Sequence, residues 1–497
     1  MQEVRVRFAP SPTGALHIGG VRTALYNYLL ARKFGGAMIL RIEDTDQNRF
    51  VPGAEEFIIE SLTWVGIKID EGLKNGVLDP NYRQSNRKPF YKQYVDQLLK
   101  DGHAYYAFDT PEELDARRKA SSNFQYDVTT RMSLNNSLSR QDFSLDRPYV
   151  IRFKVPVNTD VTVNDLIRGE VIINSSQVDD KVLMKSDGMP TYHLANVVDD
   201  HLMKISHVIR GEEWLPSAPL HVLLYRFLGW ESTMPRFAHL PLLLKPDGNG
   251  KLSKRDADKA GFPIFPLTWK DPNTNEVATG YREAGYLPEA IVNFLALLGW
   301  NPGTEQELFT MDELIEAFTI ERIGKAGAKF DILKANWFNQ QYIRKRSDEM
   351  VAFLLGELEK EGVNCSREKA SQIVDVLKER VTFPKDFVEQ SRMFFGPPVK
   401  YDEQIISKKW SKEASLYFLE LATLIRKSSA QPDYKDLVNL AAENTNVKAG
   451  SMMQLLRVIL TGGMSGPDLI IAMEIMGSVD VANRISTALA NITLKIA

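Results

Sequence analysis

The N-terminal stretch constrains the fold more than any other part of this chain. Residues 4–8 alternate apolar and charged side chains, which is typical of a strand. Two prolines and a glycine interrupt regular structure after it, and from Val21 apolar residues recur at helical steps of three and four. Where such a loop meets a helix, backbone N–H groups and the helix dipole attract anions, and Gly19 and Gly20 let a phosphate approach the backbone. The stretch predicts an anion site with His17 as a side-chain donor, although an ordinary α/β unit has the same outline.

A second glycine-rich stretch carries a cluster of cations. Lys251-Leu-Ser-Lys-Arg255 follows an apolar run over 237–244 and a turn rich in glycine. Three cations in five residues often form only a solvated surface loop. Taken together with the His17 loop, however, the stretch is similar to the second of the two signature motifs of class I aminoacyl-tRNA synthetases.

Three further stretches narrow this resemblance to one family. They are Arg7-Phe-Ala-Pro-Ser-Pro-Thr-Gly14, Arg41-Ile-Glu-Asp-Thr-Asp46 and Thr191-Tyr-His-Leu-Ala-Asn-Val-Val-Asp-Asp-His201. In these motifs the chain resembles glutamyl-tRNA synthetases of the bacterial or organellar type, over nearly its whole length. Gly20 stands where the broader class usually has a second histidine, a replacement common in the glutamyl branch. His17 is therefore the only imidazole of the first motif.

Composition excludes several other classes of protein. A chain of 497 residues is too long for one compact domain, and no run approaches the roughly 20 apolar residues of a membrane span. The N-terminus enters a strand at once, so we expect no signal or transit peptide, no membrane partner and a cytoplasmic location. The single cysteine, Cys365, excludes an intramolecular disulfide and a cysteine-based zinc site. The net charge of −3 does not indicate a polyanionic partner, so the expectation of an RNA partner rests on the motifs.

Alternating strands and helices predict a doubly wound parallel sheet, the Rossmann-like form of the α/β class. The expected elements of this domain are strands over 37–42, 182–186 and 205–209 and helices over 53–65, 88–100 and 220–227. Glu43 and the stretch 210–214 follow two of these strands. They would then lie at the carboxyl edge of the sheet, where parallel sheets bind ligands.

The resemblance implies a division of the chain into four parts. These are the first half of the catalytic domain (1–101), an α+β insertion that grips the acceptor end of tRNA (102–181), the second half of the catalytic domain with a stem-contact region and the Lys251 loop (182–325), and an all-helical anticodon-binding region (326–497) with a possible division near 376–398. Some relatives hold zinc in the insertion through cysteines. Tyr106 and Phe108 stand at those positions, so we expect no zinc. The polar run over 121–139 predicts a mobile loop.

The resemblance also assigns site residues by position. Those expected to bind glutamate are Arg7, Ala9, Ser11, Glu43, Tyr192, Asn196 and Arg210. Those expected to bind ATP are Pro10, Thr13, His17, Gly19, Gly20, Glu213, Leu243, Lys251, Ser253, Lys254 and Arg255, and the catalytic residues among them are His17, Lys251 and Lys254. A guanidinium suits a carboxylate and Glu43 suits an ammonium group, but the sequence leaves open which arginine binds which carboxylate.

We expect no resident metal ion. The set His193, Asn196, Asp199, Asp200 and His201 has the residue types of a metal site. The family resemblance explains the same residues without a metal, and we prefer that interpretation.

The resemblance implies a two-step reaction, in which glutamate attacks ATP to give an adenylate and the 3′-terminal adenosine of tRNA then accepts the glutamyl group. The expected partners are ATP with Mg²⁺, L-glutamate and tRNA(Glu), and we expect a monomer. The alternatives are a glutaminyl-tRNA synthetase, a synthetase that glutamylates queuosine in tRNA, and an inactive tRNA-binding paralogue. Arg7 near the substrate side chain favours an anion over an amide. The helical third of the chain argues against the second alternative, and the intact lysine motif argues against the third.

Overall fold

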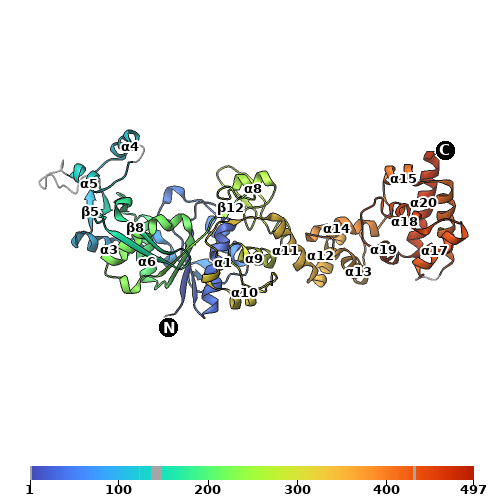
Figure 1. Ribbon diagram of the computed structural model, residues 1–497, viewed down its shortest axis with the longest axis horizontal. Helices are drawn as coiled ribbons and strands as arrows, with labels where there is room; N and C mark the ends of the chain where they lie inside the picture. Colours follow the sequence, from blue (N-terminus) through green and yellow to red (C-terminus); the bar gives the residue numbers. More distant parts are fainter. Residues whose placement is uncertain (1–2, 122–123, 136–147, 429–431, 497) are drawn as a thin grey trace. The chain divides into compact units, whose positions relative to one another are not determined.

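The computed structural model divides into two compact units, Met1–Ala335 and Asn336–Ala497 (Figure 1). It describes residues 3–121, 124–135, 148–428 and 432–496. The first unit mixes strands and helices, and the described part of the second contains helices only. This confirms the expected α/β fold with an additional helical region. Within the described ranges, no helix is both long enough and apolar enough to cross a membrane.

Parallel strands form the centre of the first unit. They are β1 (Arg5–Phe8), β2 (Ala37–Leu40), β10 (His207–Gly211) and β11 (Arg236–Leu240). β1 runs parallel to β2, and β10 runs parallel to β11. The backbone N–H of Ser206 donates to the carbonyl of Arg5 at 2.8 Å, which places β10 beside β1. The carboxyl ends of these strands therefore share one edge, and the loops with the expected site residues begin there.

Two further strands, β7 (Asp160–Asp165) and β8 (Gly169–Asn174), extend the sheet beyond β11. β7 pairs in antiparallel fashion along its length with β8, and its last residue, Asp165, lies opposite Phe237 of β11 in parallel. Sequence reasoning missed β7. Its two fully buried residues, Val161 and Val163, alternate with polar ones over a short segment, which is a weak signal for a strand.

Helix α1 (Ile18–Lys33) is buried along much of its length and packs against β1, β2 and β10. It begins three residues earlier than the apolar pattern predicts, because Nδ1 of His17 accepts a hydrogen bond from the N–H of Gly19 at 3.0 Å and caps the helix. The hydroxyl of Tyr26 donates to the carbonyls of Ala296 and Leu298. These bonds tie α1 to the segment at the end of α9 (Pro288–Leu297).

The remaining elements of the first unit surround this centre. Its other helices are α2 (Ala54–Trp64), α3 (Lys88–Lys100), α4 (Pro111–Ala120), α5 (Val128–Asn135), α6 (Tyr192–Leu202), α7 (Ala218–Phe227), α8 (Lys254–Ala260) and α10 (Met311–Ala317), and α11 (Ile332–Arg344) begins in this unit. Short strand pairs are β3 (Leu73–Lys74) with β4 (Val77–Leu78), β13 (Trp269–Lys270) with β14 (Val277–Ala278), and β12 (Leu243–Leu244) with β15 (Ala328–Lys329).

The strand expected over 182–186 does not join the main sheet. Instead β9 (Val182–Met184) pairs antiparallel with β6 (Val150–Phe153), which pairs antiparallel with β5 (Ala104–Ala107). The prediction is wrong because an apolar strand does not encode the identity of its partner. The edge of β6 is available nearby, and the N–H of Phe153 already bonds to the carbonyl of Lys181 at 2.9 Å.

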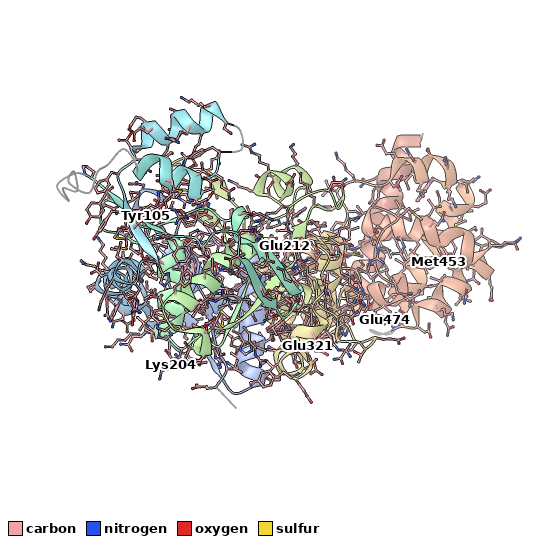
Figure 2. All side chains as sticks on the ribbon, turned by 60° about the vertical axis from the view of Figure 1, so that its left-hand side comes forward. Tyr105, Lys204, Glu212, Glu321, Met453 and Glu474 are labelled. Carbon is pink, nitrogen blue, oxygen red and sulfur yellow. The ribbon has the colours of Figure 1, made fainter. Side chains whose placement is uncertain are left out.

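The loop expected over 121–139 is wrong in part. Residues Val128–Asn135 form helix α5, while 122–123 and 136–139 lie outside the described residues. Tertiary contacts explain the helix: Arg131 is buried and pairs with Asp180 at 3.2 Å. Asp180 also accepts a hydrogen bond from the hydroxyl of Tyr105 of β5 at 2.7 Å (Tyr105 is labelled in Figure 2). A polar sequence window does not reveal such a contact.

The described part of the second unit is built from helices. They are α12 (Ser347–Lys360), α13 (Arg367–Leu377), α14 (Pro384–Ser391), α15 (Glu403–Lys409), α16 (Lys412–Lys427), α17 (Tyr434–Asn444), α18 (Ala449–Thr461), α19 (Leu469–Met476) and α20 (Ser478–Ile496). Arg484 of α20 is almost fully buried, and it donates to the carbonyl of Leu460 and to Asp480, each at 2.8 Å. This arginine thereby links α20 to α18.

Candidate active site

A cavity of about 460 Å³ lies at the carboxyl ends of β1, β10 and β11. Phe8 contributes from the end of β1 and Ala9 from the loop after it, Arg210 and Gly211 contribute from β10, and Pro241 directly follows β11. Glu212, labelled in Figure 2, directly follows β10 beside this cavity. The start of α1 and the loop before α8 complete the lining. The start of α1, the ends of the three strands and the loop that contains Lys251 therefore all line the same cavity.

His17 presents a neutral ring to this cavity. Its Nδ1 accepts the N–H of Gly19, so the ring proton lies on Nε2, which remains a donor. Burial and the nearby charge of Lys251 lower the pKa of His17 to about 4. A Cβ at Gly20 would lie 2.6 Å from Cδ1 of Leu16, so Leu16 occupies the space beside Gly20. At neutral pH the motif offers one uncharged imidazole donor.

Two arginines and two carboxylates form a buried network behind the cavity. Arg7 donates through Nε to Asp200 at 3.1 Å, and Arg41 donates to Asp200 at 2.8 Å and to Glu43 at 3.0 Å. Asn196 donates to the same oxygen of Glu43 at 2.9 Å. Among the described residues, Nη1 and Nη2 of Arg7 have no hydrogen-bond partner, and Arg7 lines the cavity. One side of this guanidinium is fixed by Asp200 and the other is available for a ligand.

The carboxylates of this network differ in their titration. Burial opposes ionisation of Asp200, but Arg7 and Arg41 outweigh it and hold the pKa of Asp200 below its usual value. Burial raises the pKa of Glu43, and its contacts with Arg41 only partly offset this effect. A ligand ammonium group beside Glu43 would favour its charged form. Glu43 is therefore suited to receive a cation.

Arg210 is buried, and all its partners are neutral. Its Nε donates to His239 at 3.0 Å, and its Nη1 donates to the hydroxyl of Tyr192 at 2.9 Å and lies 3.4 Å from Nδ1 of His221. Within the part of the chain that the structure describes, no carboxylate pairs directly with Arg210. Its positive charge therefore borders the cavity without a direct counter-ion.

The lysine loop is held by acidic residues. Nζ of Lys251 lies 3.0 Å from Glu213, and Nζ of Lys254 lies 3.5 Å from Glu276. Ser253 caps α8, of which Lys254 is the first residue. All three loop side chains are exposed, so the two lysines can exchange a carboxylate for a ligand phosphate at little cost.

The structure brings most of the predicted site residues together. Those that line the cavity are Arg7, Ala9, His17, Gly19, Gly20, Arg210, Glu213, Leu243, Lys251 and Ser253. Tyr192, Asn196 and Glu43 lie behind them, joined through the hydrogen bonds described above, and the carbonyl of Pro10 accepts the N–H of Glu43 at 3.0 Å. Ser11, Thr13, Lys254 and Arg255 are not part of the lining.

Sequence reasoning did not assign Arg22, Arg41 or Trp214. Arg22 lines the cavity and donates to the carbonyl of Leu298 at 3.0 Å, and Trp214 packs on Tyr192 with ring centroids 4.3 Å apart. Arg41 is fully buried. A charged residue within an otherwise apolar stretch, as at Arg22 and Arg41, is the signal that could have identified these two arginines.

The residues around α6 that have the types of metal ligands contact other side chains of the protein instead. Nδ1 of His193 lies 3.2 Å from His221, Asp199 pairs with Arg87 at 2.8 Å, and His201 stacks on Trp230. Across the described ranges, no three His, Cys, Asp or Glu side chains are arranged to hold a metal ion.

Tyr106 and Phe108 are the two residues on which the expectation of no zinc in the insertion rests. Both pack against Tyr149, with ring centroids 5.0 Å and 6.2 Å apart. The chain therefore presents an aromatic cluster at this position, and aromatic rings are not zinc ligands.

Comparisons with known proteins agree with this arrangement. Residues 3–337 match the family of class I tRNA synthetases (E and Q), catalytic domain, and residues 346–489 match an anticodon binding domain. The glutamate–tRNA ligase of Cytophaga hutchinsonii is 58% identical, covering 100% of this chain and 99% of the relative, and that of Phocaeicola vulgatus is 56% identical, covering 98% of each. A crystal structure of a glutamate tRNA ligase from Elizabethkingia meningosepticum, in complex with its amino acid, has a TM-score of 0.94 at 47% identity and covers 99% of this chain and 100% of that one.

We expect the imidazole of His17 to stay neutral from neutral pH down to about pH 5, because burial and Lys251 lower its pKa to about 4. The measurement is the ¹⁵N chemical shift of both ring nitrogens as a function of pH, with the proton on Nε2. An unfolded histidine titrates near 6.5 and binds protons first. The contribution of His17 to the free energy of unfolding should therefore fall as the pH drops from about 6.5 towards 4.

The variant Lys251→Met separates the two causes. Because burial is the larger one, the pKa of His17 should rise in this variant but stay below 6.5. A wild-type midpoint near 6.5, or a protonated Nδ1, would contradict both the cap and the neutral donor.

Proposed function

The chain belongs to the class I glutamyl-tRNA synthetases, enzymes that attach glutamate to tRNA, and we propose that the cavity at the ends of β1, β10 and β11 is where it does so. The relatives named glutamate–tRNA ligase match it over its full length, and the glutaminyl, queuosine-modifying and inactive alternatives are not favoured. The observation that carries the assignment of the site is that the buried guanidinium groups of Arg7 and Arg210 border one cavity.

In the proposed amino-acid site, Arg7 and Arg210 bind the two carboxylates of glutamate. Glu43 binds the ammonium group, and the positions of Tyr192 and Asn196 support further hydrogen bonds to the substrate. Ala9 and Ser11 would border the ligand from the loop after β1. Arg7 and Arg41 are balanced by two carboxylates, but Arg210 has no direct counter-ion. Glutamate carries a net charge of about −1 at neutral pH and glutamine about zero, so this site favours glutamate.

In the proposed ATP site, the phosphates lie against the start of α1. The positive end of the α1 dipole, the Nε2 donor of His17, and Lys251 and Lys254 all suit the negative charge that develops as pyrophosphate leaves the α-phosphorus. Gly19 and Gly20 permit close approach, and the ligand would also touch Pro10, Thr13, Glu213, Leu243, Ser253 and Arg255. No group of metal-ligating side chains occurs among the described residues, so Mg²⁺ would enter with ATP. The tRNA terminal hydroxyl then attacks the mixed anhydride and releases AMP.

In the second unit, we assign anticodon binding to a cavity of about 710 Å³. It is lined by residues on both sides of the Gly396–Pro398 segment and near the end of α18, with Arg380, Arg392 and Arg484 among them. Arg484 is paired with Asp480, whereas Arg380 is exposed and its Nη2 lies 3.5 Å from the hydroxyl of Ser465. Arginine and proline surfaces of this kind stack on unpaired bases.

The four-part division at 101, 181 and 325 remains a prediction, as do acceptor-end binding by 102–181, the monomeric state and the cytoplasmic location. The resemblance to the family supports them.

Aminoacylation assays test the amino-acid site. The wild-type chain should charge tRNA(Glu) with glutamate and not with glutamine. Arg7→Ala or Arg210→Ala leaves a substrate carboxylate unpaired at a cost of about 2–5 kcal/mol, so kcat/KM for glutamate should fall at least about 30-fold while KM for ATP changes little. Arg226→Ala is the control, because Arg226 is exposed on α7, pairs with Glu231 at 3.2 Å and does not line the cavity. If KM for glutamate is normal in either site variant, the arginine replaced in that variant does not bind glutamate.

Lys254 is tested by the variant Lys254→Ala. Loss of a donor to the developing phosphate charge should lower kcat by about 10² to 10³ and leave KM for glutamate almost unchanged. Lys259→Ala, on the same exposed helix α8, should behave as wild type. Equal turnover in the two variants would place Lys254 outside the reaction.

The anticodon assignment predicts that Arg380→Ala raises KM for tRNA about 10-fold, with KM for ATP and glutamate nearly unchanged. Its matched control is Arg367→Ala, an exposed arginine outside the cavity. Suppose that both variants raise KM for tRNA by the same factor and make it less dependent on salt concentration. The arginines then contribute only general positive charge, and the cavity does not read bases.

A further inference from the structure

Arg210 differs from Arg7 and Arg41 in the nature of its partners. Arg7 and Arg41 each contact a carboxylate directly, whereas Arg210 contacts the ring of His239. A carboxylate does lie nearby, but on the far side of that ring: Oδ2 of Asp165 is 2.6 Å from Nδ1 of His239. The imidazole therefore stands between a buried cation and a buried anion.

The hydrogen bonds define the protonation of this ring. A guanidinium nitrogen can only donate, so Nε2 of His239 accepts from Nε of Arg210 at 3.0 Å. Nδ1 then carries the proton and donates to Asp165. His239 is fully buried, and burial lowers its pKa, with Asp165 acting in the opposite direction. Arg210 thus faces a neutral acceptor.

Asp165 is held in place by its own donors. One carboxylate oxygen accepts the backbone N–H groups of Ile167 at 2.9 Å and Arg168 at 2.8 Å, and the other accepts the N–H of His239 at 3.1 Å. These bonds keep Asp165 at the end of β7 and away from Arg210. They also keep the acceptor nitrogen of His239 turned towards Arg210.

We propose that His239 is a positioning residue for amino-acid selection, which aims Arg210 at the cavity and keeps Asp165 from pairing with it. The charge of Arg210 then remains available for a carboxylate of the substrate. This inference rests on the proposed function, in which Arg210 binds glutamate. A direct Asp165–Arg210 pair would present a neutralised site and would remove the preference for an acidic substrate.

His239 also has a structural role that must be separated from this one. Its contact with Asp165 helps to join β11 to β7, which pair at Phe237 and Asp165. The two roles use different ring atoms, because Nδ1 serves Asp165 and Nε2 serves Arg210. Two amide substitutions can therefore separate them.

The test compares His239→Gln with His239→Asn in the full-length enzyme. The glutamine amide oxygen reaches the position of Nε2 and can accept from Arg210, whereas the asparagine amide N–H lies near Nδ1 and can donate only to Asp165. We measure KM for glutamate, KM for ATP, kcat and the melting temperature of each. The Gln variant should keep glutamate KM within about 3-fold of wild type. The Asn variant should raise it by about 10-fold to 100-fold at unchanged ATP KM.

The reverse order, with Asn close to wild type and Gln impaired, would overturn the proposal and leave His239 as a link between β7 and β11. Equal glutamate KM in wild type and the Asn variant would also overturn it. If a variant melts at a lower temperature, the same substitutions are made in an Arg210→Ala background. Positioning through Arg210 requires that His239→Asn then add no further increase in glutamate KM. An equal increase in both backgrounds contradicts it.

Arg210→Ala alone tests the proposed function on which the inference rests. If glutamate KM is unchanged in that variant, Arg210 does not bind glutamate and the site assignment fails first. If it rises and the two amide variants behave alike, only the role of His239 fails.

Discussion

Asp200 and the two arginines that share it hold the catalytic unit together. Arg7 lies within β1, Arg41 follows β2, and Asp200 lies on α6, more than 150 residues further along the chain. A buried ion pair does not stabilise a fold more than apolar residues of the same shape would. Removal of one partner, however, leaves a charge buried alone at a cost of about 3–5 kcal/mol. The network therefore specifies one arrangement of β1, β2 and α6, and the cavity at the carboxyl ends of β1, β10 and β11 depends on that arrangement.

The three arginines Arg7, Arg41 and Arg210 differ in how much of their positive charge is left for a ligand. Arg41 is fully buried and serves Asp200 and Glu43, so it contributes no free charge to a ligand. Arg7 is fixed on one side by Asp200 and open on the other. Arg210 is held by neutral groups. Three arginines of one chemical type thus have three different roles, and their partners alone decide which role each has.

The sequence correctly predicted strands and helices whose own residues show a clear periodicity. Periodicity predicted β1, α2, α3 and α7, and motifs matched position by position gave the site residues that we propose. It failed where a distant contact decides the outcome. Helix α5 depends on the contact between Arg131 and Asp180, and β9 joins β6 because that edge lies beside it in space. The early start of α1 depends on the ring of His17 as a cap, which apolar spacing does not reveal.

The amino-acid sequence by itself determined the family and the parallel sheet that leads into α1, because short segments of the chain carry the motifs and the periodicity that identify them. The tertiary structure alone decided the partner of each charge. Arg7, Arg41 and Arg210 are the same residue type in the sequence. Only the folded structure places Asp200 between Arg7 and Arg41 and the ring of His239 against Arg210. The energy of a buried charge depends on groups within a few ångströms, and in this protein those groups come from segments far apart in the chain.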